Sequence, residues 1–165
     1  MKTLTLIRHA TAKDKQILQQ DRDRELSELG RFQAKNIAKQ LKQKNSLPDC
    51  LLCSPAKRTM QTATIISKAL QLDSVIQTEN TIYAGDLDEI LNVLRCLTVP
   101  KHLFIIGHNP NLSYLAHYFC AATNFLPSLP PAGVVSLQFD IENWHDLKKT
   151  TGKLLFFIKP DHEPK

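Results

Sequence analysis

Two arginines and two histidines stand where apolar segments of the chain end. Arg8 and His9 directly follow the first apolar segment, and His108 follows a later one. Arg58 comes shortly after Ser54, which ends another such segment. A guanidinium group binds phosphate through paired hydrogen bonds, and an unprotonated imidazole is a nucleophile. Together, these residue types are suited to binding a doubly charged phosphoryl group and transferring it.

The segments around these residues follow an alternating strand and helix pattern. Strands rich in apolar and β-branched residues are predicted at 2–7, 49–53, 75–77, 102–106, 134–140 and 153–159. Helices are predicted at 27–44, 55–70, 86–97 and 110–119. Ser54-Pro55 and Asn109-Pro110 each predict a helix start, with the polar residue as N-cap and proline first in the helix. The last two strands are expected to form a closing hairpin or two sheet edges.

This alternation predicts an α/β fold, a three-layer α/β/α sandwich around a mainly parallel sheet. The chain has 165 residues, close to the roughly 150 typical of one domain, so a single domain over residues 1–165 is expected. In parallel sheets, ligands bind beyond the carboxyl ends of the strands, where the next helices begin. We therefore expect Arg8, His9, Arg58 and His108 to meet at one edge of the sheet.

Four ordered motifs give the chain a resemblance to a known family. Arg8-His9, Ser54-Pro55-Ala56-Lys57-Arg58-Thr59 with Gln61-Thr62-Ala63, and Gly107-His108-Asn109 resemble three signatures of the histidine phosphatase superfamily (branch 1). The segment Asp23-Arg24-Glu25-Leu26-Ser27-Glu28-Leu29-Gly30 resembles one typical of its small SixA-type phosphohistidine phosphatases. Where the superfamily usually has Arg-His-Gly, this chain has Ala10 in the third place, a small residue that still allows the backbone to turn near a phosphate.

The resemblance implies a phosphoglycerate-mutase-like fold and a role for each matching residue. His9 would be the nucleophile that forms a phosphohistidine intermediate, and an ordinary histidine pKa of about 6.5 would leave it reactive at neutral pH. Arg8, Arg58 and His108 would bind the non-bridging phosphoryl oxygens. Independently of the resemblance, Tyr83 lies in the loop beside the expected site, where it is expected to line the substrate groove or to pack. Because protein cations can neutralise the phosphoryl charge, no cofactor and no metal are expected.

The loop after the third predicted strand bears on the substrate. Many superfamily members that act on alcohol phosphates have a glutamate there as general acid, whereas this chain has Asn80 and Thr81 at the expected place. Of the nearby carboxylates, Glu79 is interpreted as a solvated loop charge and Asp86 as a helix cap; Asp88 is the third. An alkoxide leaving group, with a pKa on the order of 15, needs a proton, and an imidazole is far less basic. The pattern favours dephosphorylation of phosphohistidine in a protein such as a phosphotransfer domain.

Other function classes fit the sequence less well. A phosphatase of small phosphomonoesters is the alternative enzyme, and a phosphoprotein-binding module is the alternative outside enzymes. The net charge of +5 would suit nucleic acid, but the basic residues are scattered and no motif for reading nucleic acid accompanies them. Cys50 and Cys53 lie in one predicted strand, where an offset of three places their thiols on opposite faces and prevents a redox pair.

Targeting signals are not evident. No apolar run reaches the roughly 18 residues of a membrane span, and the first residues do not resemble a secretory signal. We therefore expect a cytoplasmic monomer with reduced thiols, bound neither to a membrane nor to nucleic acid. Trp144 is expected either to pack or to line the substrate groove. Four histidines are assigned no function: His102, His117, His145 and His162.

Overall fold

The computed structural model describes residues 1–72, 76–120 and 127–161, and these contain a six-stranded sheet. The strands are β1 (Lys2–Arg8), β2 (Cys50–Cys53), β3 (Ile76–Thr78), β4 (His102–Gly107), β5 (Val134–Phe139) and β6 (Lys153–Ile158). Their order is β3-β2-β4-β1-β5-β6. The first four in this order are parallel, and β5 is antiparallel to both of its neighbours. The predicted mainly parallel sheet is confirmed.

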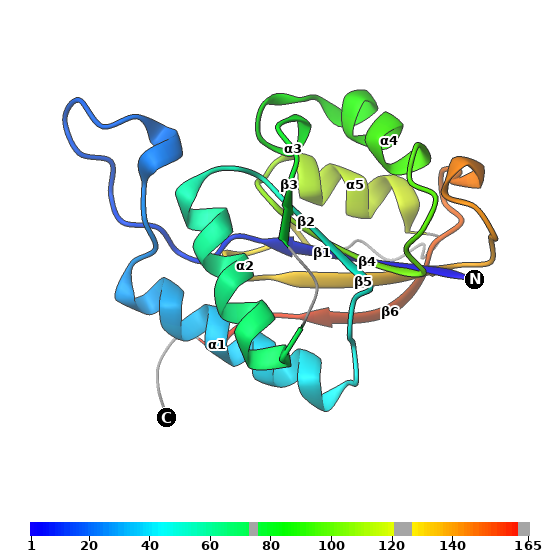
Figure 1. Cartoon of the computed structure of the whole chain (residues 1–165), viewed down its shortest axis with the longest axis horizontal. Helices are drawn as coiled ribbons and strands as arrows, with labels where there is room; N and C mark the ends of the chain where they lie inside the picture. The colour runs from blue at the N-terminus through cyan, green and yellow to red at the C-terminus, as the bar shows by residue number, and fades with distance from the viewer. Residues whose placement is uncertain (73–75, 121–126, 162–165) are drawn as a thin grey trace.

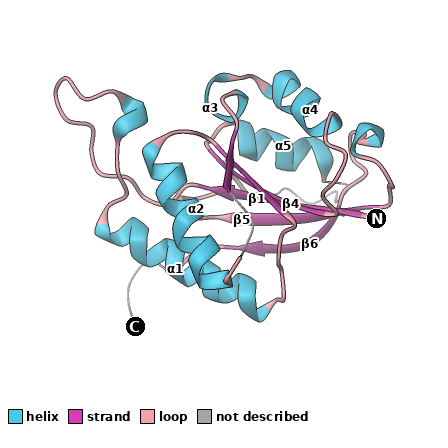
Figure 2. Ribbon diagram, viewed as in Figure 1, coloured by secondary structure: helices cyan, strands magenta, loops and turns pink. Residues whose placement is uncertain are grey.

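Helices cover both faces of this sheet (Figures 1 and 2). One face carries α1 (Glu28–Gln43) and α2 (Lys57–Leu70). The other carries α3 (Thr81–Ala84), α4 (Leu87–Arg95), α5 (Asn111–Phe119) and the short 3-10 helix η2 (Trp144–Asp146). A second 3-10 helix, η1 (Asp21–Asp23), interrupts the long connection from β1 to α1. The molecule is thus the predicted three-layer α/β/α sandwich.

Alternating side chains of the strands fill both interior layers. On β4, Leu103 and Ile105 pack toward α3, α4 and α5, whereas Phe104 and Ile106 pack toward α1 and α2. A strand covered on both faces needs an apolar residue at nearly every position, which explains the continuous apolar run there. Trp144 is fully buried in the first of these layers, so it packs and does not line a groove.

The two predicted proline-containing helix starts are wrong. The N-cap of α2 is Ala56 and not Ser54, because the Ser54 hydroxyl is engaged by a histidine described below. The N-cap of α5 is Pro110, without a side-chain cap. Asn109 instead donates its amide to the Leu129 carbonyl at 2.9 Å. Neither residue is a helix N-cap, although Ser54 Oγ accepts from the Ala56 N–H at 3.3 Å just before α2 and Asn109 Oδ1 accepts from the Ser113 hydroxyl of α5 at 2.9 Å.

Other boundaries differ in smaller ways. The helix α3 was not predicted, and the third strand lies at Ile76–Thr78, with Val75 outside the described residues. Asp86 caps α4 in a reciprocal pair with Glu89, which confirms its predicted capping role. The strand β5 lies between β1 and β6, so only β6 of the last two strands forms an edge.

The connection between β1 and α1 is closed at its base. Ala12 and Leu26 form an antiparallel bridge, and the Thr11 carbonyl accepts hydrogen bonds from the backbone N–H and the hydroxyl of Ser27. A Cβ added at Gly30 would overlap the Thr11 carbonyl oxygen. Glycine therefore permits the close contact that fixes this connection against the start of α1.

The four cysteines are free thiols. Cys50 packs on the α3–α5 side of the sheet and Cys53 on the α1–α2 side, which confirms that the two thiols face apart. In the part of the chain that the structure describes, no helix is both long enough and apolar enough to cross a membrane.

Candidate active site

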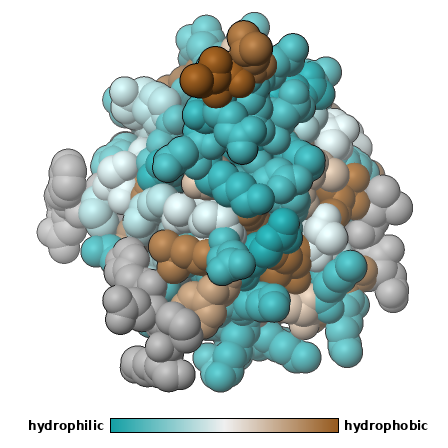
Figure 3. Space-filling view, turned by 90° about the vertical axis from the view of Figure 1, so that its left-hand side faces the viewer, coloured by the Kyte–Doolittle hydropathy of each residue, from teal (hydrophilic) through white to brown (hydrophobic). Residues whose placement is uncertain are grey.

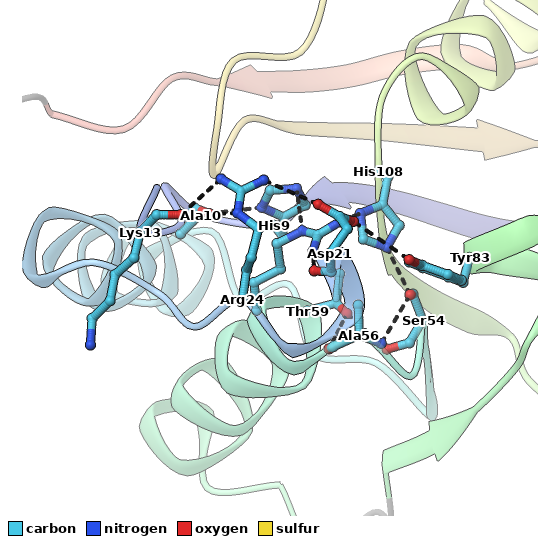
Figure 4. Close-up of polar contacts among 11 residues, drawn as sticks. His9, Ala10, Lys13, Asp21, Arg24, Ser54, Ala56, Thr59, Tyr83 and His108 are labelled. Atoms are coloured by element: carbon cyan, nitrogen blue, oxygen red, sulfur yellow. Dashed lines mark hydrogen bonds and ion pairs between the residues drawn. The ribbon is translucent and has the colours of Figure 1, made fainter. Parts of the chain in front are cut away.

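The carboxyl ends of β1, β2 and β4 bring the predicted site residues together (Figure 4). His9 follows β1, and its backbone N–H donates to the carbonyl of Gly107 at the end of β4. The ring centroids of His9 and His108 are 5.1 Å apart. Arg58, from the first turn of α2, contacts both rings. The expectation that these side chains meet at one sheet edge is confirmed.

Arg58 determines which histidine nitrogens carry protons. Its Nε donates to His9 Nε2 at 3.2 Å, and its Nη2 lies 3.2 Å from His108 Nδ1. Because a guanidinium group only donates, both of these ring nitrogens must present a lone pair. His9 Nδ1 lies 2.8 Å from the Ala10 carbonyl, which only accepts, so Nδ1 carries the proton. Neutral His9 therefore has its lone pair on Nε2.

His108 is oriented by a second partner. Its Nε2 lies 2.7 Å from the Ser54 hydroxyl. Since Nδ1 accepts from Arg58, Nε2 of the neutral ring carries the proton and donates to Ser54. The ring of Tyr83 packs edge-on against His108, with centroids 5.4 Å apart. Tyr83 thus lies beside the predicted site, as expected.

Both histidines are held in the neutral form. Burial, the largest effect, lowers the pKa of His9 to about 4, and the charges of Arg58, Arg8 and Arg24 act in the same direction against the hydrogen bond to Ala10. Burial also lowers the pKa of His108 to about 3, helped by His9 and Arg58. The unprotonated ring is therefore available over a wider pH range than an ordinary histidine would allow.

Arg8 leaves part of its guanidinium group unused. Its Nη1 donates to the Leu129 carbonyl at 2.9 Å, the same carbonyl that anchors Asn109. Its Nε is buried and has no hydrogen-bond partner within the described residues. A buried donor without an acceptor is costly, so an anion bound here would satisfy it.

Asp21 and Arg24 were not predicted to belong to the site. Asp21 Oδ2 accepts from Arg58 Nη2 at 2.8 Å and from the Tyr83 hydroxyl at 3.5 Å, and its backbone carbonyl accepts from Arg58 Nη1 at 2.6 Å. Arg24 Nη1 donates to the other Asp21 oxygen at 3.2 Å. Burial acts to raise the pKa of Asp21, but the hydrogen bonds from Arg58 and Arg24 outweigh it and hold that pKa below its usual value.

The sequence contained a signal for Arg24 and none for Asp21. Arg24 lies in the segment that resembles SixA-type proteins, and Asp21 precedes it by three residues in the loop after Arg8-His9. Nothing in composition or periodicity distinguishes this pair from solvated loop charges. Only the return of the loop to α2, which places Asp21 against Arg58, reveals its position.

The carboxylates considered from the sequence are used elsewhere. Glu79 accepts from the backbone N–H and the hydroxyl of Thr81, and Asp86 caps α4. Neither carboxylate is hydrogen-bonded to the histidines or arginines of the site. Across residues 1–72, 76–120 and 127–161, no group of three or more His, Cys, Asp and Glu side chains is placed to hold a metal ion.

Side chains of the helices fix the backbone around His9. The Thr62 hydroxyl accepts from the Ala10 N–H at 3.2 Å, and the Gln61 amide oxygen accepts from the Leu26 N–H at 2.8 Å. Gln33 accepts from both the backbone and the hydroxyl of Thr11. Ala10 has no positive φ, so alanine serves here as well as the glycine usual in the superfamily.

Comparison with known proteins agrees with this geometry. Residues 4–83 match the family model described as histidine phosphatase superfamily (branch 1). A candidate phosphohistidine phosphatase SixA from Agrobacterium tumefaciens is 26% identical, with a TM-score of 0.81 over 96% of this chain and 99% of that chain. The corresponding protein from Nakamurella multipartitia is 22% identical, with a TM-score of 0.80 over 96% of both chains.

Two further structures share the fold. The protein histidine phosphatase SixA complexed with tungstate is 22% identical, with a TM-score of 0.81 over 96% of this chain and 97% of that chain. A mycobacterial glucosyl-3-phosphoglycerate phosphatase is 16% identical, with a TM-score of 0.62 over 93% and 96% of the two chains. A comparison with curated protein sequences finds no match.

The fold and site define an α/β sandwich that gathers histidines and arginines at one sheet edge for phosphoryl chemistry. Residues 4–83 resemble the histidine phosphatase superfamily, branch 1, and 96% of the chain superposes on a SixA protein to which it is 26% identical. Together with the geometry of the site, these similarities support a histidine-dependent phosphatase with the fold of the SixA proteins.

We expect the rings of His9 and His108 to titrate with midpoints near 4 and 3 in an NMR titration of the ligand-free protein. Both values lie below the roughly 6.5 of an exposed histidine, so the unfolded chain takes up these protons first. Free energy of unfolding is therefore lost as the pH falls from about 6.5 toward 4. A midpoint near 6 for either ring would contradict the burial argument.

Replacing Asp21 with asparagine removes the negative charge that forms ion pairs with both Arg58 and Arg24. Two unit charges about 4 Å apart interact by about 1 kcal/mol in water. We therefore expect Asp21→Asn to bind inorganic phosphate about fivefold more tightly in calorimetric titration. Asp23→Asn, which makes the same change of charge on the exposed side of η1, is the matched control. Weaker binding by Asp21→Asn would mean that the carboxylate instead orients the arginines for the anion.

Proposed function

We propose that the chain hydrolyses phosphohistidine in a folded protein and that His9 is the nucleophile. The observation that carries the proposal is the lone pair on His9 Nε2, which Arg58 orients in a pocket that also receives Arg8 and His108. A nucleophile among fixed cations is the arrangement that phosphoryl transfer requires, because positioning and charge neutralisation supply most of its catalysis.

The first step exchanges one nitrogen–phosphorus bond for another. The Arg58 Nε–H turns from His9 Nε2 to a non-bridging phosphoryl oxygen, and the lone pair thus freed on Nε2 attacks phosphorus in line while the bond between phosphorus and the substrate imidazole breaks. The bonding electrons leave with that imidazole, which departs as a neutral ring when its other nitrogen is already protonated. Because the bond formed and the bond broken are of the same kind, the step is close to thermoneutral.

The second step regenerates the enzyme. Water attacks the phosphorus of phosphorylated His9, the bond to Nε2 breaks, and inorganic phosphate leaves while the proton lost by water passes to solvent or phosphate. Throughout, the Ala10 carbonyl holds the proton on His9 Nδ1, so that Nε2 regains its lone pair. This fixed tautomer supports His9 as the nucleophile of the first step and the leaving group of the second.

The neighbouring side chains stabilise the negative charge on the phosphoryl oxygens. Arg58 and Arg8 donate to the non-bridging oxygens, Arg8 through the buried Nε that has no partner within the described residues. His108 contributes its ring beside them, held by Ser54. Tyr83, edge-on to His108, lies where it can contact the bound substrate.

The state of the carboxylates supports a phosphohistidine substrate over an alcohol phosphate. Arg58 and Arg24 hold the pKa of Asp21 below its usual value, so at neutral pH this carboxylate has no proton to give to an alkoxide. Glu79 is engaged by Thr81. An imidazole, with a pKa of about 6.5, leaves without the acid that a hydroxyl of pKa on the order of 15 would need.

The relatives support the same substrate class. The structures with TM-scores of 0.80 and 0.81 are of SixA proteins, and the sugar-phosphate phosphatase has 0.62. In the proposal, the substrate is a phosphotransfer protein of the cytoplasm, and the four free thiols are compatible with that compartment.

The nucleophile is tested by His9→Ala. With phosphohistidine protein labelled with ³²P, the wild type should acquire acid-labile label after rapid quenching, and His9→Ala should acquire none. Turnover should fall by about a thousandfold or more, as for other nucleophile deletions. His145→Ala, an exposed histidine of η2, should match the wild type in both measurements. Retained label in His9→Ala would reject the assignment.

The substrate class is tested by comparing substrates whose leaving groups differ in basicity. We expect kcat/KM to decrease from a phosphohistidine protein to 4-nitrophenyl phosphate and then to glycerol phosphate, because only the last needs a proton on a strongly basic oxygen. Steady-state assays of phosphate release at one pH provide the comparison. A preference for glycerol phosphate would contradict the phosphohistidine proposal and favour a phosphatase of small phosphomonoesters.

A further inference from the structure

The connection between β1 and α1 carries an apolar tip. Ile17 and Leu18 are 95% and 99% exposed, more than any other large hydrophobic residue in the described ranges. In Figure 1 this connection, dark blue, projects from the body of the molecule on the side where β1 ends. Figure 3 shows an apolar protrusion at the top of that face, above a largely hydrophilic surface. The five tip residues 16–20 carry no charge.

The backbone of the tip is built in a conformation that suits leucine poorly. The Gln19 N–H donates to the Gln16 carbonyl at 3.1 Å and closes a four-residue turn with Ile17 and Leu18 at its centre. The Gln16 N–H donates in turn to the side chain of Gln19. Leu18 has a φ of 67°, a region where glycine or asparagine is favoured at this position of a turn. Stability of the turn therefore does not explain a leucine there, whereas exposure of its side chain to a partner does.

The tip is connected to the phosphoryl site through the base of the same loop. Asp21, three residues after Leu18, contacts Arg58. Arg24 binds the Lys13 carbonyl through Nε and Nη2, at 3.0 and 2.8 Å, and Asp21 through Nη1. Lys13, before the tip, and Asp21, after it, are thus linked through Arg24, and Asp21 in turn contacts Arg58. A protein that contacts the tip therefore contacts the same loop whose base carries Asp21, the partner of Arg58.

We propose that Ile17 and Leu18 are a docking contact for the protein that carries the phosphohistidine. The contact would be an apolar patch on that protein's surface near the phosphorylated side chain. This inference rests on the proposed function, since it identifies how that substrate is recognised beyond its phosphoryl group. The site's arginines bind the dianion in any phosphorylated molecule, and the uncharged tip adds affinity only for a protein surface.

The chemistry of the tip argues against other partners. Nucleic acid binding depends on lysine and arginine contacts with phosphates, and residues 16–20 offer none. Interfacial membrane binding uses an extended apolar face flanked by basic residues. Lys15 and Arg22 flank this tip, but Asp14 and Asp21 offset their charge, and only two apolar side chains stand on the turn. Two aliphatic side chains suit a small apolar patch on a folded protein.

The test compares two substrates of the same chemistry and different size. The probes are a histidine phosphotransfer domain phosphorylated on its histidine and phosphohistidine as the free amino acid. In the double variant Ile17→Ser/Leu18→Ser, we expect kcat/KM for the phosphorylated domain to fall about tenfold, through KM. For the free amino acid it should stay within about twofold. Val99→Ser, another exposed aliphatic residue remote from this loop in sequence, should change neither value.

A second variant separates docking from loop structure. Leu18→Asn suits the left-handed backbone better, so its melting temperature should be unchanged or higher. Its kcat/KM for the phosphorylated domain should nevertheless fall, with the value for the free amino acid retained. If leucine served only the structure of the loop, Leu18→Asn would keep full activity on both probes.

Three results would overturn the proposal. Equal loss on both probes would mean that the substitutions damage the pocket, and no loss on the phosphorylated domain would mean that the tip does not touch it. Binding of the wild type to vesicles of phosphatidylcholine and phosphatidylglycerol, lost in the double variant without a change on the phosphorylated domain, would assign the tip to a membrane. If the wild type hydrolyses alkyl phosphates and neither phosphohistidine probe, the proposed function itself fails.

Discussion

The site depends on the inability of one guanidinium group to accept a hydrogen bond. Arg58 is almost fully buried and directs its N–H groups at a ring nitrogen of His9 and at one of His108. Each of those nitrogens must present a lone pair, so both rings are neutral and their tautomers are assigned by a single side chain. Protonation of either ring would place a positive charge against the guanidinium group in a buried position. The unusually low pKa values of the two histidines follow from this arrangement together with burial.

A concentration of cations at one sheet edge needs an internal counter-charge when no anion is bound. Arg8, Arg24 and Arg58 all act on His9, and Asp21 is the carboxylate that contacts two of these arginines. Its side chain is 42% exposed, so it remains hydrated while it shares the arginines. The site is therefore organised before a phosphoryl group arrives, because the side chains of Arg24 and Arg58 are already held in place by Asp21 and need not be ordered on binding. Preorganised donors of this kind are the main source of electrostatic catalysis.

Much of this could be predicted from residues at strand ends. Arg8, His9 and His108 follow apolar strands, and parallel strands place their carboxyl ends at a common edge, so sequence was enough to bring them together. The roles of Ser54 and Asn109 could not be obtained in this way, because their local pattern is that of helix caps and only tertiary partners decide otherwise. The role of Asp21 could not be predicted for the same reason: its partner Arg58 lies 37 positions away in the chain, and local periodicity does not indicate such a contact. The four-residue helix α3 is too short to produce a recognisable apolar period.

The central position of β1 has a consequence for the order in which function can arise during synthesis. β1 precedes the other five strands of the sheet in the chain, yet its two neighbours in the sheet are β4 and β5, and the Arg8 side chain is anchored by the Leu129 carbonyl. A nascent chain that ends before these partners contains both Arg8-His9 and Arg58 but has no sheet edge on which to assemble them. The site therefore cannot assemble until β4, Leu129 and β5, all of which follow Arg58 in the chain, have been made.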